Sequence, residues 1–550
     1  MIHWTIDEPR TGGGAAASSG RASADGPADG SPAARWSLPR AVRAVRAVAA
    51  VAGLAVIGTY LAIALARLGS PVHLDILEGN SLIEVHRILA GQQLYPAPSA
   101  SYVPDGYPPL YFAVSAAAAS VLGQSYLSLR VVSLIASLAC FAILGRLVQR
   151  ETGSRGAGLG AAGLLAATYF ATDTWFDIGR VDSLFIALSI AGLYAARWAQ
   201  RTRGAVAAGL LLAAAFLTKQ TGLAEGVAVI AALALGPRRR LAVQAAITYA
   251  VVAGGSTLAL GLASHGWYVY YIFEQMSQHA LSPASAGQFW TAELLPTLGI
   301  AVAAAVAGAR RTPLVLLAGC AALLVESVAA RAQTGSNLND LLPVYLAVAL
   351  LAGLAMDGRS PLLLRRAGRL ARWAPVAASV LIIAQLGVLA AGFRTGQAFP
   401  PSADSAAGLR LEAAARAIGG TVAIPADPSI ALIAGLPQTE DQVAAADVLR
   451  ASDPTAKAIF MSSLAQAVAA QKYSAIITEF HGDLRGFPAD LRRYYYRCPQ
   501  APLDGLLSVP FSANAETIPV SVWLPAGHGS CAAVARVLEA PVTSGAGDAR

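Results

Sequence analysis

The chain has 550 residues, of which 55% are hydrophobic and only 13% are charged. A soluble protein of this size carries roughly twice that charged fraction, so the composition excludes a wholly soluble protein and indicates one that resides in a lipid bilayer. The formal net charge of +8 does not indicate nucleic-acid binding, because the Lys and Arg residues are spread through short loops between apolar segments, where a positive excess sets membrane topology.

Residues 1–46 are expected to form a disordered, basic cytoplasmic tail. Residues 1–34 are rich in Gly, Ala and Ser and have almost no apolar periodicity. A cluster of four arginines directly precedes the first apolar segment: Arg35, Arg40, Arg43 and Arg46. A basic cluster at this position favours a cytoplasmic N-terminus, and we expect no cleavable signal peptide.

About eleven apolar segments within residues 47–392 are predicted to cross the membrane as helices, several of them near the lower length limit. They are residues 47–66, 130–148, 156–172, 182–198, 204–218, 221–236, 241–263, 294–309, 313–330, 341–356 and 374–392. The two short helices within 204–236 are predicted to meet at Lys219–Gly222, because one long helix would place the flanking arginines on opposite sides of the membrane.

The apolar segment 109–123 is assigned to the outer surface because of the charges that follow it. If it does not cross, all the later basic clusters are cytoplasmic. These clusters are Arg146–Arg155, Arg197–Arg203, Arg238–Arg240, Arg310–Arg311 and Arg359–Arg372. The same topology gathers most of the unusual polar residues near the outer face: Asp75, Glu78, Tyr107, Asp173 to Asp182, Lys219, and Asn337 to Asp340. Charges at membrane depth are costly and indicate function.

The first outer loop, residues 67–129, begins with Asp75 and Glu78, three residues apart. Either carboxylate could serve as a general base toward an acceptor hydroxyl, or both could bind a divalent cation. The alternative is structural: Asp75 caps the following helix and Glu78 interacts with its dipole. That helix, NSLIEVHRILAGQ, has the apolar spacing of one lying in the membrane interface.

A second polar cluster, TDTWFDIGRVDSLFIAL, brings Arg180 and Asp182 to the start of a predicted span. Arg180 suits a phosphate or carboxylate, or else forms a structural Arg–Asp pair between two loops. Lys219 could contact a phosphate as a point charge, or extend toward the lipid headgroups.

Charged residues return from about Thr395, and residues 393–550 are predicted to form a small extracytoplasmic α/β domain. TVAIPADPSIALIAGLP predicts strand, turn, helix and turn, whereas KAIFMSSLAQAVAAQKYSAIITEF predicts strand, helix and strand. Cys498 and Cys531 lie in this region and could pair outside the cytoplasm. Cys140 and Cys320 lie in apolar runs and are interpreted as small core residues.

Several of these motifs together resemble the GT-C superfamily of integral-membrane glycosyltransferases. They are LDILEGN, an interfacial helix ending in AGQQLY, GYPPLYF, GRVDSL, LTKQTGL and GSNLNDLLPVYLAVALLAGLA. The similarity covers residues 47–392. The most similar subgroup is the bacterial relatives of protein mannosyltransferases and of the lipid A aminoarabinose transferase.

This resemblance implies an enzyme that transfers a sugar from a polyprenyl-phosphate carrier to an extracytoplasmic acceptor in the bacterial inner membrane. Asp75 corresponds to the catalytic base of the family, Glu78 to the second acidic position and Asp182 to the later one. The implied carrier or sugar contacts are Tyr107, Arg180, Lys219, Gln220, Asn337 and Asn339. Tyr107 departs from the aminoarabinose-transferase branch, which has Lys before its Pro-Pro, so Lys219 or Arg180 must supply the charge.

Three other functions are weighed against this one. A secondary transporter also has many spans, but internal repeats and midplane charges are not apparent here. An O-antigen ligase or polymerase would carry its large outer loop between late spans. A non-catalytic scaffold would use its exterior domain to bind a partner. The sequence does not identify the sugar or the acceptor, and a divalent cation, held by Asp75 and Glu78, is the one candidate cofactor.

Overall fold

The computed structural model describes residues 38–310, 312–357, 373–400, 402–479, 487–498, 508–510 and 517–539. Most of the expected N-terminal tail, Arg311 and the basic run Arg359–Arg372 lie outside these residues. The first helix, α1 (Leu38–Arg67), begins inside the segment expected to be a tail, so residues 38–46 are helical.

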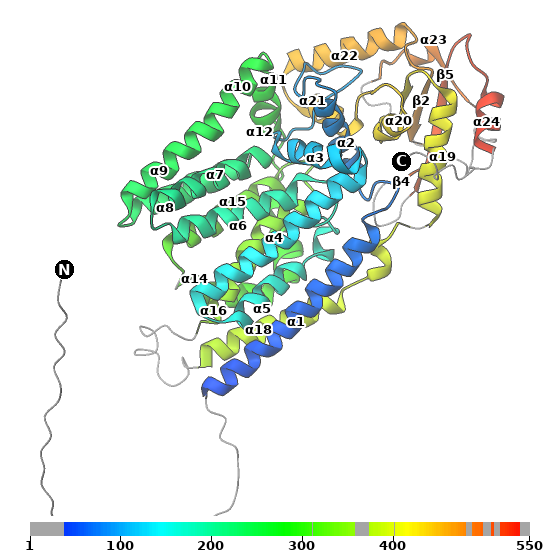
Figure 1. Cartoon of the computed structure of the whole chain (residues 1–550). Helices are drawn as coiled ribbons and strands as arrows, with labels where there is room; N and C mark the ends of the chain where they lie inside the picture. Colours follow the sequence, from blue (N-terminus) through cyan, green and yellow to red (C-terminus); the bar gives the residue numbers. More distant parts are fainter. Residues whose placement is uncertain are drawn as a thin grey trace, which may run out of the picture. The chain divides into compact units, whose positions relative to one another are not determined.

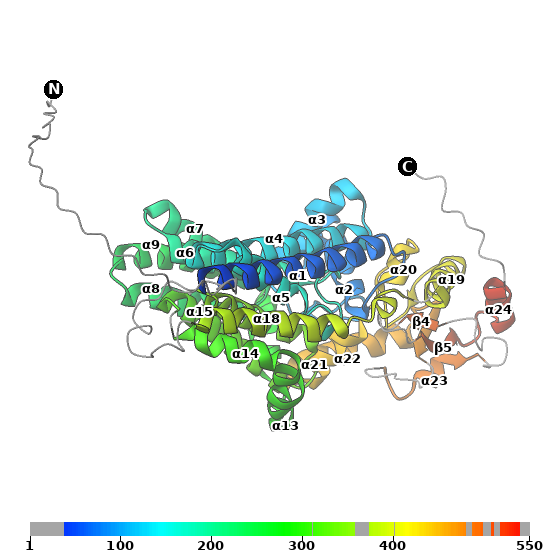
Figure 2. The same ribbon diagram turned by 90° about the horizontal axis from the view of Figure 1, so that it is seen from below.

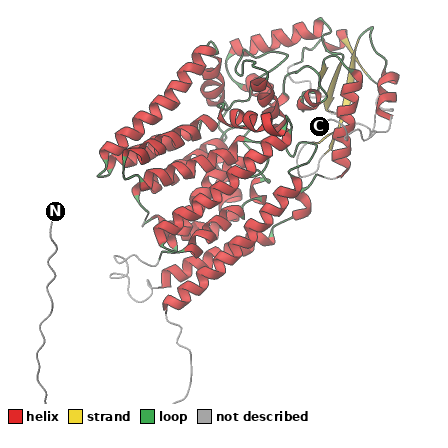
Figure 3. Cartoon of the chain, viewed as in Figure 1, coloured by secondary structure: helices red, strands yellow, loops and turns green. Residues whose placement is uncertain are grey.

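Each of the eleven predicted spans coincides with helical structure (Figure 1, Figure 3). In the described part of the chain, eight helical runs are long and apolar enough to cross a membrane. They are α1, α4 (Tyr126–Thr152), α6 (Val181–Trp198), α9 to α10 (Arg239–Ala263), α13 to α14 (Pro283–Ala309), α15 (Leu314–Ala332), η5 to α16 (Leu338–Ala355) and α18 (Ala374–Ala391). A membrane protein with several helical spans is therefore confirmed, whereas the number eleven stays a prediction.

The remaining helices of this region are shorter. They are α2 (Ile76–Leu89), α3 (Leu110–Leu122), α5 (Arg155–Ala166), η1 (Phe170–Thr172), α7 (Thr202–Thr218), α8 (Gly222–Leu235), α11 (Trp267–Val269), η3 (Tyr270–Glu274) and α12 (Gln275–Ser277). The predicted break between α7 and α8 is confirmed, because Lys219 has an extended backbone with φ −144° and ψ 126°. The break ends α7 at Thr218 and leaves Lys219 between the two helices.

Helix α5 packs closely against both α1 and α4 because it presents glycines at both contacts, and Figure 2 shows the three helices in the same part of the helical region. A Cβ on Gly163 would collide with the backbone of Gly53 in α1, and one on Gly158 would collide with the backbone of Gly145 in α4. Small residues let helix backbones approach, which compensates for the weak hydrophobic drive between helices in lipid. The short helix α5 is thus in close backbone contact with two much longer helices, α1 and α4.

The C-terminal segment contains a five-stranded sheet with helices beside it. The strands are β1 (Val422–Ala423), β2 (Ala475–Glu479), β3 (Tyr495–Arg497), β4 (Ser508–Pro510) and β5 (Thr517–Pro525). The helices are η7 (Thr395–Ala398), α19 (Ser402–Ile418), α20 (Ser429–Ile433), α21 (Gln442–Arg450), α22 (Pro454–Ala469), α23 (Leu491–Tyr494) and α24 (Cys531–Glu539). The order is β1-β2-β5-β3, with β4 also paired to β5; only β1 and β2 are parallel.

The prediction of a strand at the start of KAIFMSSLAQAVAAQKYSAIITEF is wrong. The residues KAIF, at 457–460, belong to α22 instead. Asp453 caps this helix by accepting a hydrogen bond from Thr455 N at 2.8 Å, and Pro454 opens its first turn. A capping Asp followed by Pro is a strong start signal, and it overrides the β propensity of the Ile and Phe that follow.

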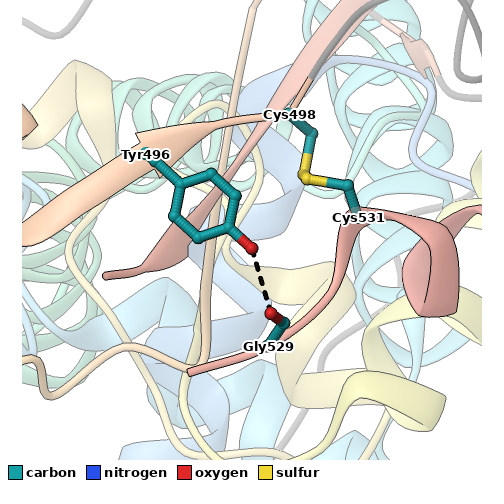
Figure 4. The surroundings of a disulfide bond; sticks show 4 residues. All are labelled: Tyr496, Cys498, Gly529 and Cys531. Carbon is teal, nitrogen blue, oxygen red and sulfur yellow. Dashed lines mark hydrogen bonds between the residues drawn. A yellow bond between two sulfur atoms is a disulfide. The ribbon is translucent and has the colours of Figure 1, made fainter. Parts of the chain in front are cut away.

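The pairing of Cys498 with Cys531 is confirmed (Figure 4). Their Cα atoms lie 5.6 Å apart, joining the end of β3 to the first residue of α24. Beside the disulfide, the Tyr496 hydroxyl donates to the Gly529 carbonyl at 3.0 Å. Cys140 and Cys320 are buried and unpaired, as expected of small core residues.

Candidate active site

Asp75 is the N-cap of helix α2. Its Oδ1 accepts a hydrogen bond from Leu77 N at 2.9 Å, which is the capping role foreseen as the structural alternative. Its Oδ2 has no partner among the described residues, so the cap leaves one carboxylate oxygen for other chemistry. Only 8% of the residue is exposed. Burial raises the pKa of Asp75 to about 6, and the hydrogen bond from Leu77 N and the charge of Arg180 limit the rise.

Glu78 is fully occupied by partners inside the protein. Arg130 of α4 donates to both of its carboxylate oxygens, from Nε at 3.0 Å and from Nη2 at 2.7 Å. Leu74 N and Gly179 N donate to the same two oxygens at 2.7 and 2.6 Å. Burial opposes the charge, but Arg130 and these hydrogen bonds outweigh it and lower the pKa of Glu78. This ion pair joins α2, α4 and the loop before α6.

Arg180, at the N-cap of α6, joins helix α2 to the loop that contains Asp105. Its Nη1 donates to Asp105 Oδ2 at 2.9 Å and to the Leu77 carbonyl at 3.1 Å. Its guanidinium carbon lies 5.0 Å from the centre of the Tyr107 ring. The Nε is buried and has no partner in the described part of the chain. The predicted Arg–Asp pair between loops is therefore present, and Arg180 keeps its Nε as a hydrogen-bond donor without a protein partner among the described residues.

Two residues further on, Asp182 is the centre of a second group of contacts. Its Oδ1 accepts from Lys219 Nζ and from Asn339 Nδ2, each at 3.0 Å, whereas its Oδ2 is buried without a partner among the described residues. Lys219 also donates to Asp340 Oδ1 at 3.0 Å. Lys219 is only 4% exposed, so it neither extends toward headgroups nor carries an unpaired charge.

The structure brings together most of the residues predicted from the sequence. Gln220 donates from Nε2 to the Gly106 carbonyl at 2.9 Å, which connects the α7–α8 break to the loop of Tyr107. Burial raises the pKa of Tyr107 to about 12. Asn337 is separate from this group: it is exposed, and its Oδ1 caps the short helix η5 by accepting from Leu338 N.

Three charged residues of the site were not singled out from the sequence: Glu84, Asp105 and Arg130. Glu84 Oε1 accepts from Asp105 N at 2.8 Å, and Tyr102 donates its hydroxyl to Oε2. Burial raises the pKa of Glu84 to about 8. Arg130 was the detectable one, because it is a charge at the first position of a predicted span that carries no other charge until Arg146.

The contacts of Glu78 do not suit a divalent cation held jointly with Asp75. Both oxygens of Glu78 face donors, two of them from a guanidinium, and a metal would place like charges together. Within the described ranges, no group of three or more His, Cys, Asp or Glu side chains is arranged to hold a metal ion.

The C-terminal segment packs directly on the helix that carries Asp75. His73 Nδ1 lies 2.5 Å from Asp427 Oδ2, and the hydroxyls of Tyr126 and Ser429 are 2.7 Å apart. Gly79 is required on α2, because a Cβ there would collide with the Asp427 side chain. Between the later part of α2 and residues 432–438 is a cavity of about 690 Å³, whose polar lining includes His86, Arg87, Gln92, Gln124, Gln438 and Lys472.

These features define a helical membrane protein with a buried polar site where helix α2 meets the ends of several spans. Residues 106–268 match the family model of dolichyl-phosphate-mannose-protein mannosyltransferases. The predicted resemblance to the GT-C superfamily is confirmed, and the chain has the fold of that superfamily. The matched residues include Tyr107, Arg180 and Lys219, whereas Asp75 lies before them.

The fold is similar to that of ArnT from Cupriavidus metallidurans. For ArnT bound to undecaprenyl phosphate, the TM-score is 0.55 and the identity 15%, over 86% of this chain and 97% of that one. For the apo state of ArnT, the TM-score is 0.53 at the same identity and coverage. No match was found among curated proteins.

Proposed function

We propose that the protein is a membrane glycosyltransferase that moves a sugar from a polyprenyl-phosphate carrier to a hydroxyl acceptor outside the cytoplasm. The observation that carries this proposal is Asp75: a buried carboxylate with one unused oxygen, at the start of an outer-loop helix and within the field of Arg180. The fold shared with ArnT bound to undecaprenyl phosphate supports the type of donor.

In the proposed reaction, the acceptor hydroxyl oxygen attacks the anomeric carbon of the sugar. Asp75 Oδ2 takes the hydroxyl proton as the new C–O bond forms. The bond between the anomeric carbon and the phosphate oxygen breaks, and the carrier phosphate leaves with the electron pair. A base with a pKa near 6 is mostly deprotonated at neutral pH and still accepts a proton in the transition state.

Arg180 is proposed to stabilise the charge that develops on the leaving phosphate. Its Nε has no protein partner in the described part of the chain, and its Nη1 is fixed by Asp105 and Leu77. A guanidinium held in place before the reaction stabilises a developing anion without reorganisation. Lys219 is already shared by Asp182 and Asp340, so we assign it a positioning role.

Asp182 Oδ2 and Gln220 Oε1 are proposed to bind sugar hydroxyls. Both oxygens are buried and unpaired among the described residues, and such acceptors are costly unless a donor satisfies them. Glu78 is proposed to position α2 through Arg130 rather than to react. The polar cavity of about 690 Å³ lies along the later part of α2, at Leu82, His86 and Arg87, and Asp75 is not among its lining residues.

The extracytoplasmic side is supported by two independent features. The basic loops that follow α4, α6 and α8 all fall on the opposite side if the site is outside. The Cys498–Cys531 disulfide is of a kind that persists in oxidising compartments and is rare in the cytoplasm. Alkaline phosphatase fused after Gly396 should be active, and an inactive fusion would overturn this orientation.

The test of the function is transfer from a panel of radiolabelled polyprenyl-phosphate sugars by the purified protein in nanodiscs. Wild type should consume at least one donor, and Asp75→Asn should reduce turnover by 10²-fold or more, the contribution of a general base. Asp453→Asn is the matched control, because Asp453 caps α22 in the same way far along the chain. Equal turnover by Asp75→Asn and wild type would remove Asp75 as the base.

A further inference from the structure

A second cavity lies between α1, α4 and α5, in the part of the molecule expected to face the cytoplasm. Its volume is about 470 Å³, within the range of ligand sites. The walls are apolar and come from all three helices, including Ile57, Leu138, Phe141 and Leu159. The glycine-rich helix α5 forms the base of the cavity, with α1 and α4 on either side. It can do so because its glycines contact α1 closely at Gly53 and α4 closely at Gly145.

The polar residues of this cavity are Arg146 and Gln149, near the C-terminal end of α4, and Arg155, at the first position of α5. Both arginines are exposed. Neither makes a hydrogen bond or an ion pair with any residue in the described part of the chain. Two guanidinium groups without a protein partner among the described residues therefore lie at one end of an apolar groove, and the lining includes no carboxylate that could neutralise them. Such an arrangement favours binding of an anion.

The dimensions match one leaflet of a bilayer. Leu138 and Gln149 mark the groove along α4, and eleven residues of α-helix span about 16 Å. The hydrocarbon of one leaflet is about 15 Å thick. An acyl chain that lies along Leu138 and Phe141 would thus place its headgroup beside Arg146 and Arg155.

We propose that this groove binds an anionic phospholipid, with one acyl chain between α1 and α4 and its phosphate on Arg146 and Arg155. Charge complementarity selects the headgroup, since basic pockets between membrane helices on the cytoplasmic side bind anionic lipids. The apolar walls select a molecule with a hydrocarbon tail. None of these residues belongs to the candidate active site, so the bound lipid is a structural ligand and not the sugar donor.

The test measures lipid retained by the purified full-length protein, using native mass spectrometry with phosphatidylglycerol and, separately, phosphatidylcholine. Wild type should retain phosphatidylglycerol preferentially. The double variant Arg146→Gln/Arg155→Gln should bind it roughly 30-fold more weakly, from the loss of two charges at the membrane surface. Ala142→Phe, which fills the groove from α4 without removing a charge, should also lose the lipid.

Arg239→Gln/Arg240→Gln is the matched control, because it removes two exposed arginines from the same expected side, outside the groove. This pair should bind like wild type. Equal retention of the two lipids by wild type, equal loss in the control pair, or unchanged binding in Ala142→Phe would each overturn the proposal. Displacement of the lipid by inorganic phosphate alone would also do so, because it would show a simple anion site.

Discussion

Replacing Asp75 by Asn is expected to stabilise the protein at neutral pH while it lowers the rate of the proposed transfer by 10²-fold or more. Burial raises the pKa of Asp75 from its ordinary value of 3.8 to about 6. A carboxyl whose pKa is higher in the folded state costs stability once it ionises there. The cost therefore grows as pH rises from 3.8 to about 6, and it is fully present above about 6.

The two pKa values give the size of the effect. Their difference corresponds to about 3 kcal/mol in the free energy of unfolding. Asn carries no charge and keeps an oxygen that can accept from Leu77 N, so the cap survives. Asp75→Asn should therefore gain up to about 3 kcal/mol at pH 8 and only about 0.5 kcal/mol at pH 4.

The assay is thermal unfolding of the purified variants in detergent across this pH range. Asp453→Asn is the control, because Asp453 makes the same kind of cap contact, to Thr455 N at 2.8 Å, but is only partly buried. It should show no gain at high pH. A lower unfolding temperature for Asp75→Asn at pH 8, or a gain that does not shrink on acidification, would refute the reasoning.

Three further outcomes are expected. Glu78→Gln should lower the free energy of unfolding by about 3–5 kcal/mol, because it leaves Arg130 buried without its carboxylate. The double variant Glu78→Gln/Arg130→Gln should recover part of this loss, as measured by thermal unfolding. Arg180→Lys should keep the fold but lower turnover at least tenfold. The single ammonium group of Lys cannot replace the Nη1 contacts with Asp105 and Leu77 and also offer the separate donor that Arg180 has at Nε. Unchanged turnover would contradict the proposed role of Arg180. Cys498→Ser should destabilise the protein by about 4 kcal/mol, because the disulfide to Cys531 closes a loop of 33 residues. Identical mobility of wild type and variant on non-reducing gels would argue against the disulfide.

The helices and the centre of the site were predictable because charges are conspicuous in apolar sequence. Arg180, Asp182 and Lys219 interrupt or begin apolar runs, and in the structure Asp182 is hydrogen-bonded to Lys219 and interacts electrostatically with Arg180. Asp105 was missed for the opposite reason. It lies in a polar loop rich in Pro and Tyr, where an Asp is ordinary, and only the folded chain shows it paired with Arg180.

The C-terminal segment shows where local patterns fail. The parallel pair β1 and β2 follows the expected order of elements, but β5 pairs with β2 through contacts such as Ile476 with Trp523, far apart in the sequence. Such pairing depends on packing between distant residues and leaves little periodicity to detect. The docking of Asp427 on His73 has no sequence signal either, because neither residue stands in an unusual local pattern.

The docking of the C-terminal segment on α2 also fixes when the site can form during synthesis. Arg87 of α2 donates to Gln438, a residue 351 positions later in the chain. At about 5–20 residues per second, the ribosome needs roughly 20 to 70 seconds to make that stretch. The helix that carries Asp75 thus emerges long before its partner exists. Until Gln438 has been made, α2 lacks this contact, so the surroundings of Asp75 would be completed only late in translation.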